Sequence, residues 1–137
     1  MAVIDNEVDE DVLGRIPNTM LEREEFLLEE LEVYVGMTVY NSSLKADVYI
    51  SQDSIEETAH HAAKSESSTI AALNMLNVIE KAEVVETCKP KNNGQKSKFH
   101  FRDMYELRIE MRYVGDIKLM IGKQGRRNYM EYCITAQ

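Results

Sequence analysis

The first half of the chain switches between helical and strand periodicity. Over residues 19–35, apolar residues recur every three or four positions and glutamates fill most of the others, which predicts an amphipathic helix. Thr19 followed by Glu22 is a possible capping box at its start. The period then shortens, and residues 38–40 and 47–50 are predicted to be short strands joined by a polar turn.

Two further helices are predicted before the pattern changes again. The first covers about residues 54–63, with Ser51 or Asp53 as its N-cap. The serine-rich sequence KSESS ends it, and Ser67 or Ser68 is predicted to cap a helix over residues 69–82. The spacing of its apolar residues predicts a buried stripe made of Ile70, Leu73, Leu76 (or Asn77) and Ile79.

From Glu83 onward the period is mostly two, which is typical of strands with one buried face. Asn93-Gly94 is a hairpin signal inside this region. The predicted strands cover residues 83–88, 97–101, 104–114, 117–121 and 129–135. We therefore expect an α+β fold, in which two to three N-terminal helices pack on an antiparallel sheet of about four or five strands.

Residues 1–18 are acidic and show little periodicity, so we expect a flexible leader followed by a single domain over residues 19–137. A chain of 137 residues can bury a sufficient core without a disulfide or a metal. Cys88 and Cys133 form no paired motif and are predicted to be reduced core thiols. No apolar run is long enough to span a membrane, and no signal peptide begins the chain, so a cytoplasmic protein is expected.

The net charge of −8 is unevenly distributed, because residues 1–86 are strongly acidic and residues 87–137 are basic. Acidic helices lying against a basic sheet would explain this asymmetry through packing and solubility alone. Contact with nucleic acid is expected only through the basic C-terminal half, where phosphates could be bound.

His60 and His61 are adjacent, which suggests a metal or an acid–base site. Two histidines on a helix chelate one metal at a spacing of four residues, not one, so no metal is predicted. Both are expected on the flank of the helix, near its C-terminus, where a histidine complements the helix dipole. A catalytic role for either would require that the helix brings it to His100.

His100 is the stronger candidate for catalysis. Period two places it on the polar face of a strand together with Arg102, and the next strand adds Arg108 and Arg112 to that face. Ribonucleases use such arrangements, in which the histidine moves a proton and the arginines bind the phosphate. Cross-strand salt bridges with alternating glutamates explain the same pattern without a substrate.

The sequence GKQGRRN, residues 122–128, is predicted to be a basic loop. Lys123, Arg126 and Arg127 beside two glycines are candidate phosphate ligands, but the spacing is not that of a P-loop. A solvated basic loop is the alternative interpretation. No cofactor is indicated by any motif in the chain.

Residues 37–135 resemble a large polyvalent protein-associated domain, a type found in long multidomain proteins of phages and conjugative elements. The resemblance is carried by Asn41 before a short strand, Ser51 and Ser54 at a helix start, Ala82 before the sheet, and the stretch FHFRDMYELRIEMRYVGDIKLMIG. It implies a layout similar to that of the ribonuclease toxins of the barnase, colicin and RelE type. Fold similarity alone does not imply their activity.

Two functions follow as expectations. The first is an accessory or interaction domain without catalysis of its own, whose partner is a protein or a neighbouring domain of a larger polyprotein. The alternative is a ribonuclease-like toxin or a degenerate descendant, with His100, His61 and His60 in proton transfer and the basic residues binding phosphate. Whether the chain is an enzyme stays open at this point.

Overall fold

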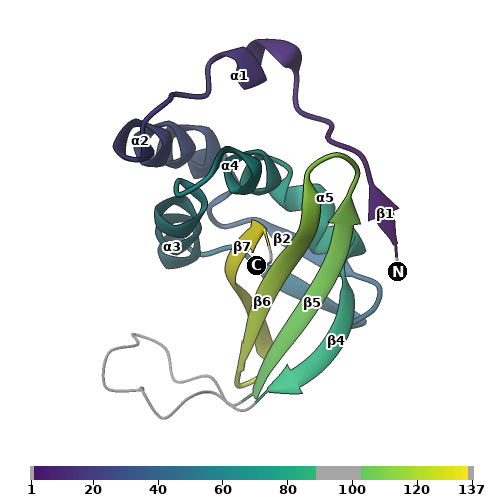
Figure 1. Ribbon diagram of the computed structural model, residues 1–137. Coiled ribbons are helices and arrows are strands. Elements are labelled where there is room, and N and C mark those ends of the chain that lie inside the picture. Colours follow the sequence, from purple (N-terminus) through teal and green to yellow (C-terminus); the bar gives the residue numbers. More distant parts are fainter. Residues whose placement is uncertain (1, 89–102, 136–137) are drawn as a thin grey trace.

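The computed structural model describes residues 2–88 and 103–135, and within these residues the chain forms five α-helices, a 3-10 helix and seven strands in one sheet (Figure 1). The helices are α1 (Glu10–Gly14), α2 (Met20–Leu31), η1 (Glu32–Tyr34), α3 (Gln52–Ala62), α4 (Glu66–Leu73) and α5 (Met75–Lys81). The strands are β1 (Val3–Ile4), β2 (Thr38–Asn41), β3 (Ala46–Tyr49), β4 (Glu83–Cys88), β5 (Asp103–Met111), β6 (Gly115–Gln124) and β7 (Arg127–Thr135). The expected α+β class is confirmed.

Three of the helices have a serine or threonine hydroxyl as their N-cap. The Thr19 hydroxyl accepts a hydrogen bond from the backbone N–H of Glu22 at the start of α2. Ser51 and Ser54 form a reciprocal capping box at the start of α3. Ser65, and not the predicted Ser67 or Ser68, caps α4 by accepting from the Ser68 N–H. These caps satisfy N–H groups that have no partner within the helix.

The prediction of one helix over residues 69–82 was wrong, because the chain breaks at Asn74 into α4 and α5. The Asn74 amide donates to the Ile70 carbonyl, a side-chain bond that competes with helix continuation. The break also rotates the buried face. Ile70, Leu73 and Leu76 of the predicted stripe are only half-buried, and the buried side chains of the two helices are Ser68, Thr69, Ala71, Ala72, Met75, Val78 and Ile79.

The sheet is larger than predicted and mixed instead of antiparallel. Its strand order is β1-β5-β6-β7-β3-β2, and β4 pairs with β5 beside β1. β1 runs parallel to β5, and β3 runs parallel to β7 through the pairs Val48–Asn128 and Tyr49–Tyr129. Both parallel pairs join segments that are distant in sequence, and local periodicity carries no information about such partners.

The core lies between the helices and the inner face of β5, β6 and β7. Leu107, Ile109, Leu119 and Ile121 are fully buried there, together with Cys133. In Figure 1 the helices gather on one side of this sheet, and β1 lies along the far side of β5. The alternation predicted for residues 104–114 is therefore confirmed as far as Met111.

Helices α3 and α4 also cover the edge of β7 beyond the point where β3 stops pairing with it. The Thr58 hydroxyl accepts from the Cys133 N–H at 3.3 Å, and the Ser68 hydroxyl accepts from the Thr135 N–H at 3.2 Å. The Ser68 and Thr135 hydroxyls also bond to each other. These contacts satisfy strand N–H groups that would otherwise be buried without a partner, and they fix α3 against β7.

Residues 1–18, predicted to be a flexible leader, contain both β1 and α1. Asn74 holds this segment, because its Nδ2 donates to the side-chain oxygen Oδ1 of Asn6 and its own Oδ1 accepts from the Glu7 N–H at 2.9 Å. The start of the domain at residue 19 stays a prediction.

Candidate functional site

Titratable side chains gather on the outer face of the sheet, where α3 lies beside β7. The register places Glu106 opposite Met120, Arg108 opposite Lys118, and Met120 opposite Tyr132. We call the following residues the polar cluster: Glu57 and His61 of α3, Glu106 and Arg108 of β5, Lys118 of β6, and Glu131 and Tyr132 of β7.

A β-bulge in β7 builds one end of this cluster. Ile121 pairs with Met130 and Met120 pairs with Tyr132, so Glu131 is an extra residue between two ladder positions. The bulge shifts the alternation of the strand by one residue, and therefore both Met130 and Cys133 are buried. Bulges of this kind re-aim a side chain, in this case that of Glu131.

Glu131 is the most perturbed carboxyl in the described part of the chain. Burial raises its pKa above the usual value, and the nearby Glu57 carboxylate raises it further, while the Lys118 ammonium opposes both effects. One carboxyl oxygen is buried without a hydrogen-bond partner among the described residues. A carboxyl with a raised pKa is suited to proton transfer near neutral pH, although structural ion pairs also perturb pKa values.

His61 joins α3 to this end of the sheet. Its Nε2 lies 2.8 Å from Glu57 Oε1, and its ring centroid lies 6.0 Å from that of Tyr132. His60 lies further out, with its side chain 60% exposed and Nδ1 3.3 Å from Glu24 Oε1 of α2. Both histidines lie on the flank of α3, as predicted, and each is paired with a glutamate.

Charges at the other end of the cluster neutralise one another. Glu106 accepts from Arg108 Nε at 2.9 Å, and its second oxygen lies 3.7 Å from the Lys118 ammonium. The Lys118 ammonium also lies 5.9 Å from the centre of the Tyr132 ring. This is the salt-bridged polar face that the sequence offered as an alternative to a phosphate site.

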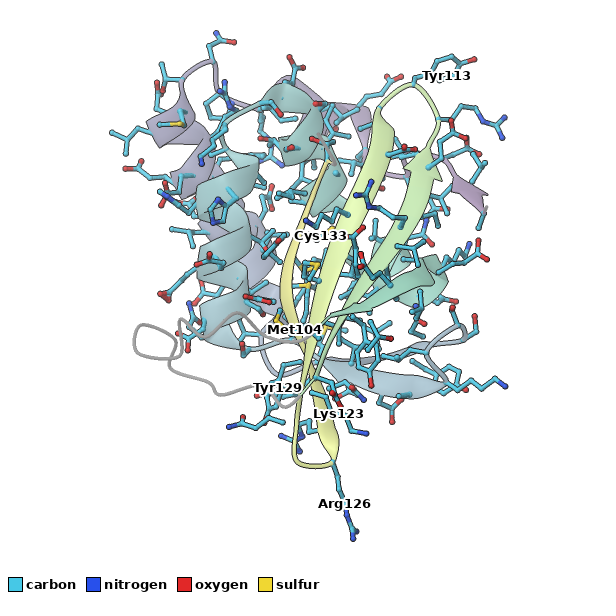
Figure 2. The ribbon with its side chains drawn as sticks, turned by 60° about the horizontal axis from the view of Figure 1, so that its bottom comes forward. Met104, Tyr113, Lys123, Arg126, Tyr129 and Cys133 are labelled. Carbon is cyan, nitrogen blue, oxygen red and sulfur yellow. The ribbon has the colours of Figure 1, made fainter. Side chains whose placement is uncertain are left out.

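The predicted phosphate ligands do not converge on one place. Arg112 follows β5 at the turn into β6 and pairs with Asp5 at 3.3 Å, while Arg108 lies within the polar cluster. Lys123 is the last residue but one of β6, Arg126 lies in the β6–β7 turn, and Arg127 begins β7. Figure 2 shows Arg126 extending from one end of the sheet, opposite the end that carries Tyr113.

The segment GKQGRRN is a tight hairpin instead of a loop. Strands β6 and β7 extend through Gln124 and from Arg127, so that Gly125 and Arg126 alone form the turn. Gly125 has φ +61°, a conformation that favours glycine. Arg127 stacks 5.0 Å from the centre of the Tyr49 ring, which itself meets the Tyr129 ring edge to face.

Two predicted site residues, His100 and Arg102, lie outside the described residues, as do the Asn93-Gly94 turn and the strand predicted over residues 97–101. Over residues 2–88 and 103–135, no group of three potential metal ligands is close enough to hold a metal ion. None of the helices in the same part of the chain is long and apolar enough to cross a membrane.

Periodicity missed four members of the cluster. Lys118 and Glu57 occupy ordinary solvent-facing positions, and the sequence contains no sign that α3 packs beside β7. The orientation of the Tyr132 and Glu131 side chains depends on the bulge, and no local motif predicts the bulge. The single available signal was the spacing of three between the apolar residues Met130 and Cys133, which breaks a period of two.

The fold and its face define a small α+β domain in which a curled mixed sheet is covered by helices on one face and carries paired charges on the other. Residues 18–129 match the family of large polyvalent protein-associated domain 3, and the chain belongs to this family. The resemblance seen in the sequence is thereby confirmed. Comparison with curated proteins and with solved structures found no match.

Proposed function

We propose that this protein is a docking domain of larger polyvalent proteins of phages and conjugative elements, without catalysis of its own. Membership of a polyvalent protein-associated family supports a role beside neighbouring domains. Such a domain needs a stable scaffold and an accessible surface for a protein partner, and it needs no reactive group.

One observation carries the proposal: four of the candidate groups in the described part of the chain, His60, His61, Arg108 and Arg112, are already paired with carboxylates. His61 is engaged by Glu57, Glu106 by both Arg108 and Lys118, and Arg112 by Asp5. A phosphate entering this face would have to displace carboxylates that already neutralise the cations. Paired charges of this kind suit a solvated face that fixes the fold.

A ribonuclease-like activity is the second candidate, and the Glu131 end of the polar cluster favours it. Glu131 with its raised pKa, His61 beside Tyr132, and the Lys118 ammonium come from three elements to one side of the bulge. In this function Glu131 and His61 would exchange protons with the RNA, and Lys118 would stabilise the phosphate charge. The layout similarity to the barnase, colicin and RelE toxins, which the family resemblance implies, is a second reason to test this candidate.

Cleavage of a labelled RNA pool of mixed sequence separates the two functions. We expect the purified protein to leave the RNA intact from mildly acidic to mildly basic pH, at a protein concentration where a known ribonuclease digests it fully. The variants His100→Ala, His61→Ala and Glu131→Gln would then be indistinguishable from the unmodified protein.

Glu110→Gln is the control, because Glu110 is exposed and belongs to none of the candidate sites. Cleavage that persists in Glu110→Gln and disappears in His61→Ala or His100→Ala would overturn the docking proposal and establish the nuclease. Cleavage that persists unchanged in all four variants would show that none of these side chains catalyses it, which would count against the proposed acid–base residues.

A further inference from the structure

Within residues 2–88 and 103–135, the outer edge of β2 has no partner strand. β2 ends the order of the sheet and pairs only with β3 among the described residues. Met37 O accepts from the Ile50 N–H at 2.9 Å, which fixes which residues of β2 face β3. By alternation the backbone of Val39 faces β3, and the N–H and C=O groups of Thr38 and Tyr40 point away from the sheet.

This edge also lacks the features that usually prevent strand pairing. Natural edge strands carry charges, prolines or bulges that block a new strand, whereas residues 36–44 contain no charged residue and no proline. Tyr40 is 55% exposed and Met37 is 39% exposed. A groove of about 400 Å³ runs beside the edge, lined by Thr38, Val39, Tyr40, Ser42, Glu80 and Lys81.

The opposite edge of the sheet shows the contrast. β4 carries Glu83 and Glu86, so pairing with β4 of a second copy would bring carboxylates together. The Val84 N–H already donates to the Ser43 hydroxyl, and the Glu83 carboxylate accepts from the Ala2 N–H. β4 is therefore protected by charge and by existing contacts, whereas the outward N–H and C=O groups of Thr38 and Tyr40 have no hydrogen bond within the described residues.

We propose that the β2 edge binds the β2 edge of a second copy of this chain, antiparallel and with two-fold symmetry about Val39. This inference rests on the proposed docking function and names its surface and partner. Thr38 of each copy would lie opposite Tyr40 of the other, so that the outward N–H and C=O groups form four hydrogen bonds. The two sheets would become one.

The charge of the chain favours a second copy at this place. With a net charge of −8, two copies repel each other at most surfaces, but the uncharged segment 36–44 brings no like charges together. The groove wall is neutral as well, since Glu80 and Lys81 line it together. On the outer side of the sheet the pairs of Thr38 with Tyr40 match a β-branched residue with an aromatic ring, a favourable cross-strand pair.

The test is the molar mass of the full chain in solution, measured by light scattering and sedimentation over a range of concentrations. We expect a reversible dimer for the unmodified protein. A variant with Thr38→Lys and Tyr40→Lys should be monomeric, because the substitutions place like charges opposite each other. A second variant with Thr38→Glu and Tyr40→Glu should be monomeric for the same reason.

Mixing the two variants distinguishes a blocked edge from a damaged fold. Opposite charges would then face each other, and we expect a dimer containing one copy of each. Val85→Lys on β4, where Val85 is also half exposed, is the matched control and should leave the dimer intact. A monomeric unmodified protein at every concentration, or a dimer that survives the lysine variant, would overturn the inference.

Failure of this inference is distinguishable from failure of the proposed function. A monomer that cleaves no RNA overturns the β2 pairing and leaves the docking proposal in place. A dimer that cleaves RNA, with the activity lost in His61→Ala, overturns the docking proposal and leaves the β2 pairing in place.

Discussion

The two faces of the sheet formed by β5, β6 and β7 share one backbone, but their side chains differ in polarity and in burial. The inner face is apolar and closed, with Leu107, Leu119 and Ile121 fully buried. The outer face holds Glu106, Arg108 and Lys118, each half-buried and paired with a neighbour of opposite charge. The inner face therefore stabilises the fold through the burial of apolar surface. The ion pairs of the outer face contribute much less to the free energy of folding, because exposed and half-exposed pairs gain little over their separate solvation by water.

The largest effect is expected from removing a side chain of the inner face. Leu119→Ala should lower the free energy of unfolding by about 3 kcal/mol, because the substitution removes buried apolar surface and leaves a cavity. Lys118→Ala, the next residue on the outer face, should cost less than about 1 kcal/mol. Urea unfolding followed by circular dichroism measures both, and equal losses would contradict the difference between the faces.

Asn41 tests how a polar residue is tolerated on the buried side. Its amide donates to the Ile79 and Ala82 carbonyls at 2.8 Å, and its carbonyl oxygen accepts from the Leu44 N–H at 2.6 Å. Asn41→Ala leaves these backbone groups without their partner and should cost about 2 kcal/mol. Ser42→Ala, an exposed neighbour, should change stability by less than about 0.5 kcal/mol in the same measurement.

The ion pair of Glu106 and Arg108 measures what pairing contributes on the outer face. A double-mutant cycle with Glu106→Gln and Arg108→Gln should give a coupling free energy of about 0.5 kcal/mol that decreases with added salt. A coupling free energy of zero at low salt would show that the pair does not stabilise the fold. A value several times larger than expected would show that the pair behaves like a buried ion pair.

Glu131 gives a small effect with a defined dependence on pH. Its pKa is raised in the folded state, so ionising it destabilises the fold, and stability falls as pH rises from the ordinary glutamate value to the raised value. Glu131→Gln removes this penalty. We expect the variant to gain stability relative to the unmodified protein at neutral pH and to lose the advantage toward pH 4.5.

Urea unfolding over a series of pH values, with the exposed Glu110→Gln as control, measures this difference. A Glu131→Gln variant that is less stable than the unmodified protein at neutral pH would show that the ionised carboxylate has a stabilising partner instead.

Much of the secondary structure was predictable because it depends on neighbouring residues. The caps at Thr19 and Ser51, the short strands on either side of residues 42–45, and the alternation up to Met111 all act over a few positions. The break at Asn74 was missed, because its effect depends on which bond the side chain makes. The adjacent histidines were correctly placed on a helix flank.

The sequence by itself determined the α+β class and the separation into a buried and a polar face, since both follow from residue types and spacing. It also carried the family, through the match over residues 18–129. Tertiary structure alone decided that β1 and β3 run parallel to distant strands and that a bulge aims Glu131 beside α3. It also decided that the outer edge of β2 has no partner strand among the described residues. Strand pairing uses backbone N–H and C=O groups that nearly every residue carries, and therefore no local pattern of residues indicates which distant segments meet.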